Sequence, residues 1–467
     1  MEETPQIDRI SQLPDILRLH ILSLLPRRYA IRTGVLSNQW KDLWKHRFPG
    51  SISLDFSEKC SGGLEPDDLA AHVRSIFLKY HCWRIDSFHL SLFVFDHLQE
   101  SVTSWIKHVV SRDVEDINLD FHPGQFLRPA DLLLISENRF TLFEHYFQDT
   151  NGCGPVIAVM RLRWCELHPD FSFQSFRSLE VLNLFQVDVT DSIVERLVSN
   201  CPLLECLELR ECNLLVYIEV SHPNSRIRRL AIIDCLNVEE IKISASNLQV
   251  FHSHGKFPTK YLFESTPSLN DVIMTSCIEE HLRKAEMVMG DNHVEVLTLC
   301  SRALQHIFGS TNSNFGAFGN LRELQLVMMQ MTNENVMDIF HFFREFNFPV
   351  LEKIFIEFPT DLKDTPVFNF MNLPSAVAPE IHFNNLKMVK LTNFKNYKNE
   401  MMLVRFFIKN AVSLENIILV LDHETDCNFH SLQNEVSLML RETGQVMVQL
   451  DDDGSVCPKH SKIYCNI

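Results

Sequence analysis

Two groups of cysteine and histidine residues carry side chains that can bind a transition metal. They are Cys201, Cys206 and Cys212 and, near the end of the chain, Cys457, His460 and Cys465. Structural zinc sites use four such ligands, usually in closely spaced pairs. The first group instead follows an apolar repeat, in which cysteine serves as a small apolar residue. The second has irregular spacing in a segment that we expect to be frayed. We predict no metal at the first group and regard a metal at the second as the less favoured alternative.

The sequence offers no set of residues for catalysis. It has no glycine-rich phosphate loop, no nucleophile elbow and no pair of zincin histidines. The acidic run Asp451-Asp452-Asp453-Gly454 follows an alternating Val446, Val448 and Leu450 pattern that is typical of a strand. A solvated turn therefore explains the run better than a calcium loop. We expect a non-catalytic protein that needs no cofactor.

Charge is distributed unevenly along the 467 residues. The chain has a net charge of −17, yet residues 1–50 contain eight Lys or Arg against five Asp or Glu, a net charge of +3. A basic first segment and an acidic remainder indicate that the two parts bind different partners. The overall acidity argues against binding to nucleic acid or to an anionic membrane.

The compartment follows from the N-terminus and from the cysteine content. Residues 1–7 lack the basic and apolar regions of a signal peptide, and no apolar run approaches the length of a membrane span. Thirteen cysteines without an export signal indicate reduced thiols. We expect the protein in the cytoplasm, the nucleus or both.

The segment 8–49 has the pattern of three short helices. Leu13-Pro14 suits a first helical turn, and apolar residues at three- and four-residue steps continue to a stop at Pro26. A second helix is expected over about 29–36. A third helix would follow with an apolar face formed by Trp40, Leu43, Trp44 and Phe48. So small a module buries little core, so we expect some apolar surface to remain for a partner.

Three stretches of this segment, 8–15, 21–26 and 35–44, resemble plant F-box domains in order and spacing. The resemblance implies docking on the Skp adaptor of a Skp–cullin–F-box ubiquitin ligase. The residues that would form or support the docking surface are Leu13, Pro14, Ile16, Leu17, Ile21, Leu24, Leu25, Val35, Leu36 and Trp40. The sequence departs from the family at Asn38-Gln39 and Lys41, which replace the usual basic residues. It also has Gly34 within the second helix, at a cost of up to ~1 kcal/mol.

An apolar-x-x-apolar-x-apolar template recurs thirteen times after residue 84. Its clearest copies begin at Leu179, Leu204 and Leu321, and successive copies from Ile157 to Leu414 begin 21 to 35 residues apart. Most of these spacings lie near the ~20–29 residues of leucine-rich repeats. One such strand cannot bury its apolar face alone, whereas parallel stacking buries a continuous ladder. The template therefore predicts a solenoid.

The repeats also carry a resemblance. Residues 176–184 and 199–212 are similar to plant F-box proteins with leucine-rich repeats, and 386–418 resembles the FBD module at the C-terminus of such proteins. Taken by itself, 386–418 reads as a strand, an amphipathic helix with Leu403, Phe406 and Phe407, and a second strand. Residues 123–153 fit the template poorly and indicate an insertion, which we expect to be helical over 131–147.

We therefore predict an α/β protein with a three-helix F-box followed by a leucine-rich-repeat solenoid, with parallel strands on its concave face and helices and loops on its convex face. The expected domains are an F-box at 8–49, a helical linker at 50–84, a solenoid at 85–384 with the insertion near 123–153, FBD-like terminal repeats at 385–450 and a tail at 451–467.

The positions between the apolar residues of each template should face a partner. They include Asn183, Glu208, Ala231, His254, Ile273 and Gln325. We favour a basic, partly aromatic subset as the substrate-binding surface: Arg161, Arg163, Phe185, Arg210, Arg229 and His252. Guanidinium groups suit carboxylate and phosphate ligands, so we expect an acidic or phosphorylated target segment, or another anionic ligand. A scatter of solvated charges is an equally favoured interpretation.

The resemblance implies the substrate-recognition subunit of a Skp–cullin–F-box ubiquitin ligase. Its partners would be a Skp-family adaptor, a cullin bound through that adaptor, and an unknown target protein; nucleic acid and membranes are not expected. Two alternatives stay open: a repeat protein that binds partners outside any ligase, and a small-molecule-gated receptor of the same architecture.

Overall fold

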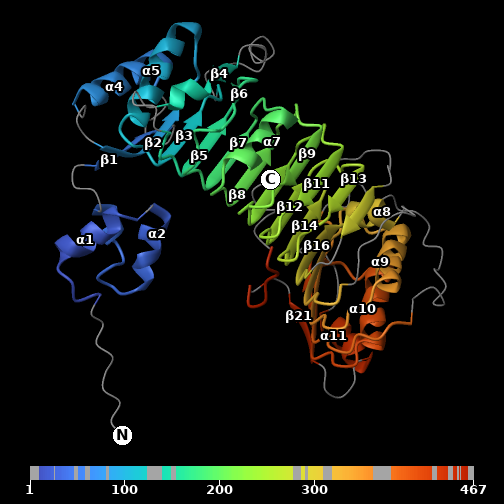
Figure 1. The fold of residues 1–467 in the computed structure, drawn as a ribbon. Coiled ribbons are helices and arrows are strands. Elements are labelled where there is room, and N and C mark those ends of the chain that lie inside the picture. Colours follow the sequence, from blue (N-terminus) through green and yellow to red (C-terminus); the bar gives the residue numbers. More distant parts are fainter. Residues whose placement is uncertain are drawn as a thin grey trace. The chain divides into compact units, whose positions relative to one another are not determined.

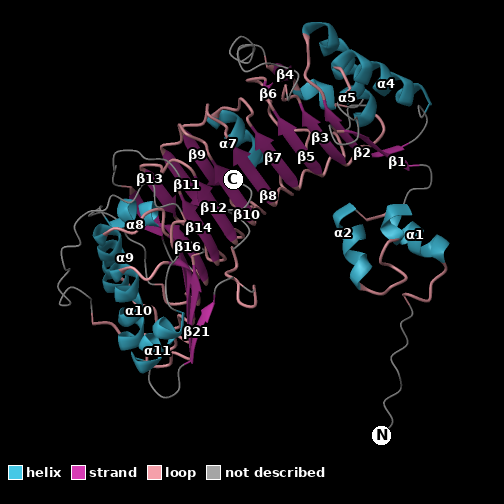
Figure 2. Cartoon of the chain, turned by 180° about the vertical axis from the view of Figure 1, so that it is seen from behind, coloured by secondary structure: helices cyan, strands magenta, loops and turns pink. Residues whose placement is uncertain are grey.

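The computed structural model describes residues 10–25, 27–46, 51–57, 64–79, 84–123, 139–148, 154–276, 285–289, 293–308, 318–360, 380–422, 429–439, 445–449, 452 and 454–460. The chain divides into two compact units, Met1–Leu207 and Glu208–Ile467 (Figure 1). Each unit contains a ladder of parallel strands with helices beside it (Figure 2). The predicted α/β class, an F-box followed by a leucine-rich-repeat solenoid, is confirmed.

The N-terminal head of the first unit consists of the helices α1 (Asp15–Ser23) and α2 (Arg27–Arg32) and the 3-10 segments η1 (Thr33–Val35) and η2 (Leu43–His46). The predicted third helix is wrong, because turns and η2 replace it. Trp40 N–H donates to Ser37 O, and Leu43 N–H donates to Trp40 O, which are the i−3 bonds of tight turns. Phe48 lies outside the described residues.

The first unit's ladder runs in the order β1, β2, β3, β5 and β7. These strands are Ser51–Phe56, Arg84–Ser91, Asp116–Asp120, Val159–Arg163 and Val181–Phe185. Its other elements are α4 (Pro66–Lys79), η3 (Asp96–Leu98), α5 (Gln99–Val110), β4 (Phe140–Leu142), η5 (Glu144–Phe147), β6 (Cys165–Leu167) and α7 (Asp191–Asn200). One apolar row crosses the ladder in register, formed by Leu54, Phe88, Ile117, Met160 and Leu182. The last four are buried residues of the repeat template, as predicted, whereas Leu54 lies before the first template copy.

Two features of the first unit differ from the prediction. The segment 50–84, expected to be a helical linker, contains β1 before α4. The template missed this strand because Ser51 stands where its first apolar residue should be. The helix expected over 131–147 is also wrong at its described end, where Phe140 and Leu142 belong to a strand that pairs with β6. Residues 131–138 lie outside the described residues.

The second unit's ladder contains one strand for each later template and ends in β21. Its strands are β10 (Arg229–Ile233), β12 (Val250–His254), β14 (Asp271–Thr275), β16 (Val296–Cys300), β17 (Glu323–Val327), β18 (Lys353–Glu357), β19 (Met388–Phe394), β20 (Asn416–Leu421) and β21 (Gln445–Gln449). β8 (Cys206–Arg210) spans the unit boundary. The second unit's helices are α8 (Ser301–Phe308), α9 (Asn333–Glu345), α10 (Lys398–Asn410) and α11 (Phe429–Met439).

The expected FBD-like strand, helix and strand correspond to β19, α10 and β20. The apolar face predicted for this helix is buried at Leu403, Phe406 and Phe407. Phe406 packs on Phe340 of α9, with ring centroids 4.9 Å apart. The longer repeats therefore cover the ladder with helices that contact one another through aromatic side chains.

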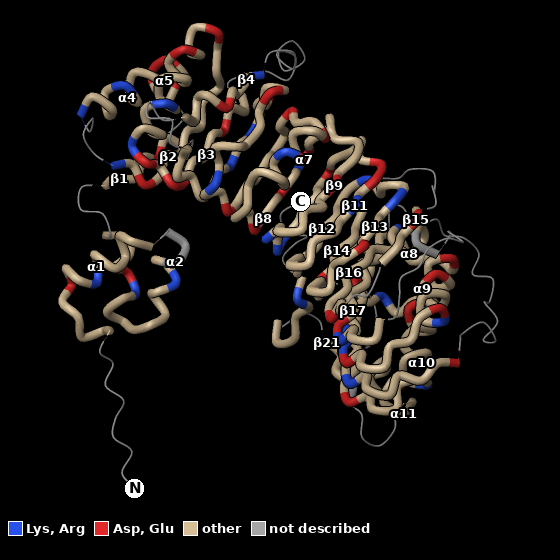
Figure 3. The backbone as a smooth tube through the Cα atoms, in the orientation of Figure 1, with Lys and Arg blue, Asp and Glu red and all other residues tan. Residues whose placement is uncertain are grey.

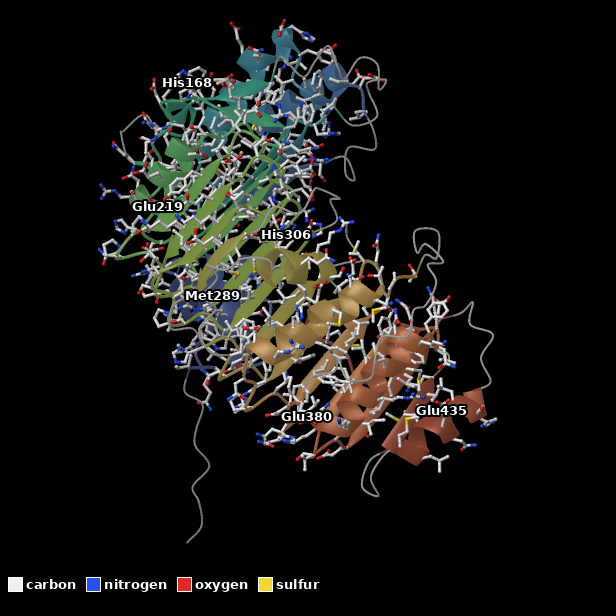
Figure 4. The ribbon with its side chains drawn as sticks, turned by 90° about the vertical axis from the view of Figure 1, so that its right-hand side faces the viewer. His168, Glu219, Met289, His306, Glu380 and Glu435 are labelled. Carbon is white, nitrogen blue, oxygen red and sulfur yellow. The ribbon has the colours of Figure 1, made fainter. Side chains whose placement is uncertain are left out.

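A second parallel sheet in this unit was missed by the template. Its strands are β9 (Tyr217–Ser221), β11 (Glu240–Ser244), β13 (Lys260–Phe263) and β15 (Glu286–Met289), in the order β15-β13-β11-β9. Figure 4 labels Glu219 on β9 and Met289 on β15, the two edge strands. Here strands stand where we expected helices and loops, because repeats of 21 to 25 residues leave little room for more than a second strand and two turns.

A carboxylate secures the loop after β6 in the first unit. Glu144 accepts hydrogen bonds from the backbone N–H and hydroxyl groups of Ser172 and Ser175 and from the N–H of Phe173, at 2.6 to 3.2 Å. Burial alone would raise the pKa of Glu144, but these hydrogen bonds lower it below its usual value. The ionised form is therefore the one that the folded loop stabilises.

Replacing this carboxylate should destabilise the first unit in a pH-dependent way. Glu144→Gln should lower its free energy of unfolding by about 1–3 kcal/mol at pH 7, because half-buried donors lose a charged acceptor. A lowered pKa in the folded state stabilises at pH values above the unfolded pKa and loses that effect as pH falls through the folded pKa. Urea unfolding at pH 7 and below pH 4 should show the gap between the two proteins shrinking in acid; a constant gap would contradict this.

Candidate functional site

The head has a small core held by three residues. Leu22, Ala30 and Trp40 are buried, and Leu25, Leu43 and Trp44 pack partly against them. Arg18 ties α1 to the turn that precedes this tryptophan, since its guanidinium donates to Gln39 O at 2.9 Å and pairs with Asp15. Ser11 Oγ donates to Ser37 Oγ at 2.7 Å, which is a second link to the same turn. Two hydrogen bonds thus hold the turn just before this tryptophan against α1 and the residues that precede it.

Seven other apolar side chains of the head's helices and turns face solvent and form what we call the head surface: Ile16, Leu17, Ile21, Leu24, Ile31, Val35 and Leu36. Val35 is 88% exposed, Ile16 79% and Leu24 71%. Monomeric proteins rarely leave so many apolar side chains exposed together unless a partner covers them. The head surface is therefore a candidate interface.

The structure sorts the predicted docking residues into two groups. Pro14, Ile16, Leu17, Ile21, Leu24, Val35 and Leu36 are exposed, whereas Leu13 and Leu25 are half-buried and Trp40 is buried. Sequence reasoning could not separate them, because tryptophan suits an interface as well as a core. It also missed Ile31, which stands four residues before Val35 and is likewise exposed, though less so.

A second candidate surface is the open face of each ladder, which carries the residues between the buried template positions. In the first unit, Arg161 and Arg163 on β5 and Phe185 on β7 occupy this face. Arg161 Nη1 lies 2.8 Å from Asp116 Oδ1, and Arg163 Nη1 lies 3.2 Å from Asp120 Oδ2. The guanidinium of Arg163 also lies 4.6 Å from the ring centroid of Phe185. The structure brings these three residues together, but carboxylates on β3 already offset the two positive charges.

The other predicted substrate residues, Arg210, Arg229 and His252, belong to the second unit. Arg210 Nε lies 4.0 Å from Glu208 Oε1, and Arg229 is exposed. Burial, together with the positive charges of nearby His254, His460 and Arg210, lowers the pKa of His252 to about 4. That histidine is therefore neutral at pH 7. Figure 3 shows Lys and Arg interspersed with Asp and Glu along both ladders.

Two cysteines of the first group are packing residues, whereas Cys206 is half-buried and Cys457 of the second group is exposed. Cys201 and Cys212 are buried, and burial raises the pKa of the Cys201 thiol to about 12, so that it stays protonated. Over the described part of the chain, no cluster of three histidine, cysteine or acidic residues could hold a metal ion. Cys465 lies outside that part.

The expectation of a frayed tail is wrong at its described end. His460 is buried, and its Nε2 lies 2.9 Å from Asp271 Oδ1. Sequence alone gave little reason to expect this contact, because the two residues are 189 positions apart. No described helix is long and apolar enough to cross a membrane.

Comparison with known proteins gives two family matches. Residues 10–49 match the F-box domain, and residues 76–444 match the LRR domain described as At1g61320/AtMIF1. Similar proteins come from Arabidopsis thaliana. The putative FBD-associated F-box protein At1g61330 is 24% identical over 91% of this chain and 94% of its own length. The FBD-associated F-box protein At1g61320 is 21% identical over 89% of both chains, and the F-box/FBD/LRR-repeat protein At1g13570 is 27% identical over 64% of this chain and 60% of its own.

The division between core and surface in the head leads to a test. Trp40→Ala should unfold the head, because a large cavity costs about 3–5 kcal/mol and a module of this size has little stability to lose. Val35→Asp should change its stability by no more than about 0.5 kcal/mol, because that side chain is exposed. Hydrogen exchange of the amides of α1 and α2 in the full chain measures both. Equal protection in the two variants would show that the assignment is wrong.

Proposed function

We propose that this chain, which belongs to the family of plant F-box proteins with an LRR domain of the At1g61320/AtMIF1 type, is the substrate-recognition subunit of a Skp–cullin–F-box ubiquitin ligase. Domains of these two kinds together are typical of such subunits. In this role the head docks on the Skp-family adaptor, and the repeats bind a target protein. The head surface carries the proposal, because a free head would leave seven large apolar side chains in water.

The proposed mechanism needs no catalytic residue in this chain. Holding a target beside the ubiquitin-conjugating enzyme raises the effective concentration of the target's lysines, and that proximity accelerates transfer. The residues that we assign to adaptor docking are Pro14, Ile16, Leu17, Ile21, Leu24, Ile31, Val35 and Leu36. Trp40 supports them from beneath. The protein would act in the cytoplasm, the nucleus or both, and the domain limits of 8–49, 85–384 and 385–450 form part of this proposal.

Target binding is assigned to the open faces of the ladders. The pairing of Arg161 and Arg163 with Asp116 and Asp120 favours a target segment of mixed charge over a purely acidic one. An incoming carboxylate must compete with the carboxylates already present, whereas a segment with both signs can pair with both sets. Phe185, stacked on Arg163, offers an apolar contact between them.

Adaptor docking can be tested with two substitutions on the head surface. Ile16→Asp combined with Val35→Asp should reduce co-purification with a Skp-family adaptor at least about a hundredfold, because two buried apolar contacts become desolvated charges. Leu438→Asp on α11 is the matched control, since that leucine is also 88% exposed but lies in the second unit. Adaptor binding retained by the double variant, with the control unchanged, would refute the docking assignment.

Target binding can be tested with substitutions in the first unit of the full chain. Arg163→Glu should abolish the capture of target proteins while leaving adaptor binding unchanged, since it places a carboxylate against Asp120 and removes the cation over Phe185. Arg177→Glu is the control, because Arg177 is exposed and lies on no strand. The measurement is the set of proteins that accumulate on each variant when the proteasome is inhibited. Identical sets would count against this surface.

A further inference from the structure

The open faces of the two ladders differ in how far their residues are buried. On β5 and β7 of the first unit, buried and half-buried residues alternate, as in a strand with one solvent-facing side. From β14 to β20 the central open-face residues are buried too. They are Ile273, Thr298, Gln325, Phe355, Lys390 and Ile418. Several are apolar, so this part of the open face is built to be covered.

The C-terminal segment, described at residue 452 and over residues 454–460, supplies cover at three points. It crosses the strands from β19 towards β14, on the side of the ladder away from α8 to α11 (Figures 1 and 2). At the first point, Lys390 Nζ donates to Asp452 Oδ1 at 2.7 Å and to Val456 O at 2.6 Å. This lysine is only 2% exposed in its side chain, so the segment provides the partners of a buried cation.

The second point is apolar. Phe355, Met388, Ile418 and Val420 form a buried cluster, and Val456 packs against it. Without the segment, part of this cluster would face water, and each buried methylene group is worth about 0.8 kcal/mol. The cluster accepts an apolar side chain four residues after the acidic one.

The third point is a carboxylate that receives two basic groups. Lys459 Nζ lies 2.7 Å from Asp271 Oδ2, and His460 Nε2 lies 2.9 Å from Asp271 Oδ1. His460 Nδ1 is also hydrogen-bonded to Thr298 Oγ1 at 2.7 Å, and the N–H of Lys459 donates to Glu323 Oε1 at 2.8 Å. Burial alone would raise the pKa of Asp271, but the two basic neighbours lower it.

The segment is held as a bound peptide is held. It is irregular rather than a strand of the ladder, and its anchors are single side chains separated by exposed residues such as Ser455 and Cys457. Asp271 and Lys390 have opposite charges and are both buried, and a buried charge without a partner is costly. The surface therefore recognises an acidic residue, an apolar residue four positions later, and a basic residue followed by histidine three positions after that.

We propose that this surface, defined by Asp271, Thr298, Glu323, the Phe355 cluster and Lys390, is a peptide-recognition site that residues 452–460 occupy within the same chain. A target protein displaces them with a segment of the same chemistry: acidic, then apolar, then lysine and histidine. This inference rests on the proposed function, since it names the class of segment that the ligase subunit reads.

The test uses the full chain and a fluorescent synthetic peptide with the sequence of residues 451–461, in which serine replaces Cys457. Lys459→Ala combined with His460→Ala weakens the chain's own segment. This variant should bind the peptide at least about tenfold more tightly than the unsubstituted protein, in which the tethered segment competes at an effective concentration of roughly millimolar. Adding Asp271→Asn should remove that gain. A peptide with glutamate in place of its lysine and histidine is the control and should not bind.

Several outcomes would overturn the inference. The first is that the peptide binds both proteins with equal affinity, and the second is that peptide binding survives Asp271→Asn. The third is that the peptide binds neither protein, which would identify the segment as a permanent part of the core. If Asp271→Asn lowers the melting temperature, Thr298→Val replaces it, because that change removes the hydroxyl partner of His460 and keeps the side-chain shape. Adaptor co-purification is measured on the same proteins. If none of these proteins co-purifies with the adaptor, the ligase role is refuted. If the adaptor co-purifies but the peptide does not bind, only the recognition site is refuted.

Discussion

A strand with one apolar face cannot bury that face alone, and the repeats of this protein all depend on that constraint. Each template buries its fourth and sixth residues only when the next strand stacks beside it in register. In the second unit, one such row passes through Leu230, Phe251, Val272, Leu297 and Leu324. The register holds even where the template degenerates. Ser253 takes an apolar position in the parallel row, and its hydroxyl is satisfied by the hydroxyl of Tyr261 at 3.0 Å.

The same register explains why the repeats were predictable and the partners of individual side chains were not. All thirteen templates coincide with ladder strands, because burial every second residue is a local pattern. The lateral neighbour of a residue depends instead on repeat length. Arg163 lies directly beside Asp120 because two repeats 43 residues apart stack in register. Read one strand at a time, the arginines look like a free basic patch, and the paired carboxylates become visible only across the strands.

Other parts escaped prediction for different physical reasons. The second sheet has its own alternation, at Ile218 and Val220 and again at Ile241 and Ile243, but a search tuned to one strand per repeat passes over it. The prediction of a third helix in the head was wrong because Trp40 enters the core from a turn, where α-helical spacing does not apply. The sequence contains one indirect sign that the C-terminal segment covers the second ladder. Ile273, Phe355 and Ile418 are apolar at positions that face solvent in an uncovered ladder, which indicates a cover without identifying it.

The two candidate interfaces differ in the physics of selection. The head surface is apolar and should tolerate changes of single residues in its partner, because burial of hydrocarbon depends on area more than on the identity of one residue. The covered part of the second ladder contains Asp271 and Lys390, two buried charges of opposite sign. Such charges add little stability when paired, but they impose a large penalty on any segment that leaves one unpaired. Rejection of wrong segments, more than attraction of right ones, would then set specificity on the repeats. The resident segment 452–460 keeps both charges paired while the surface has no other occupant.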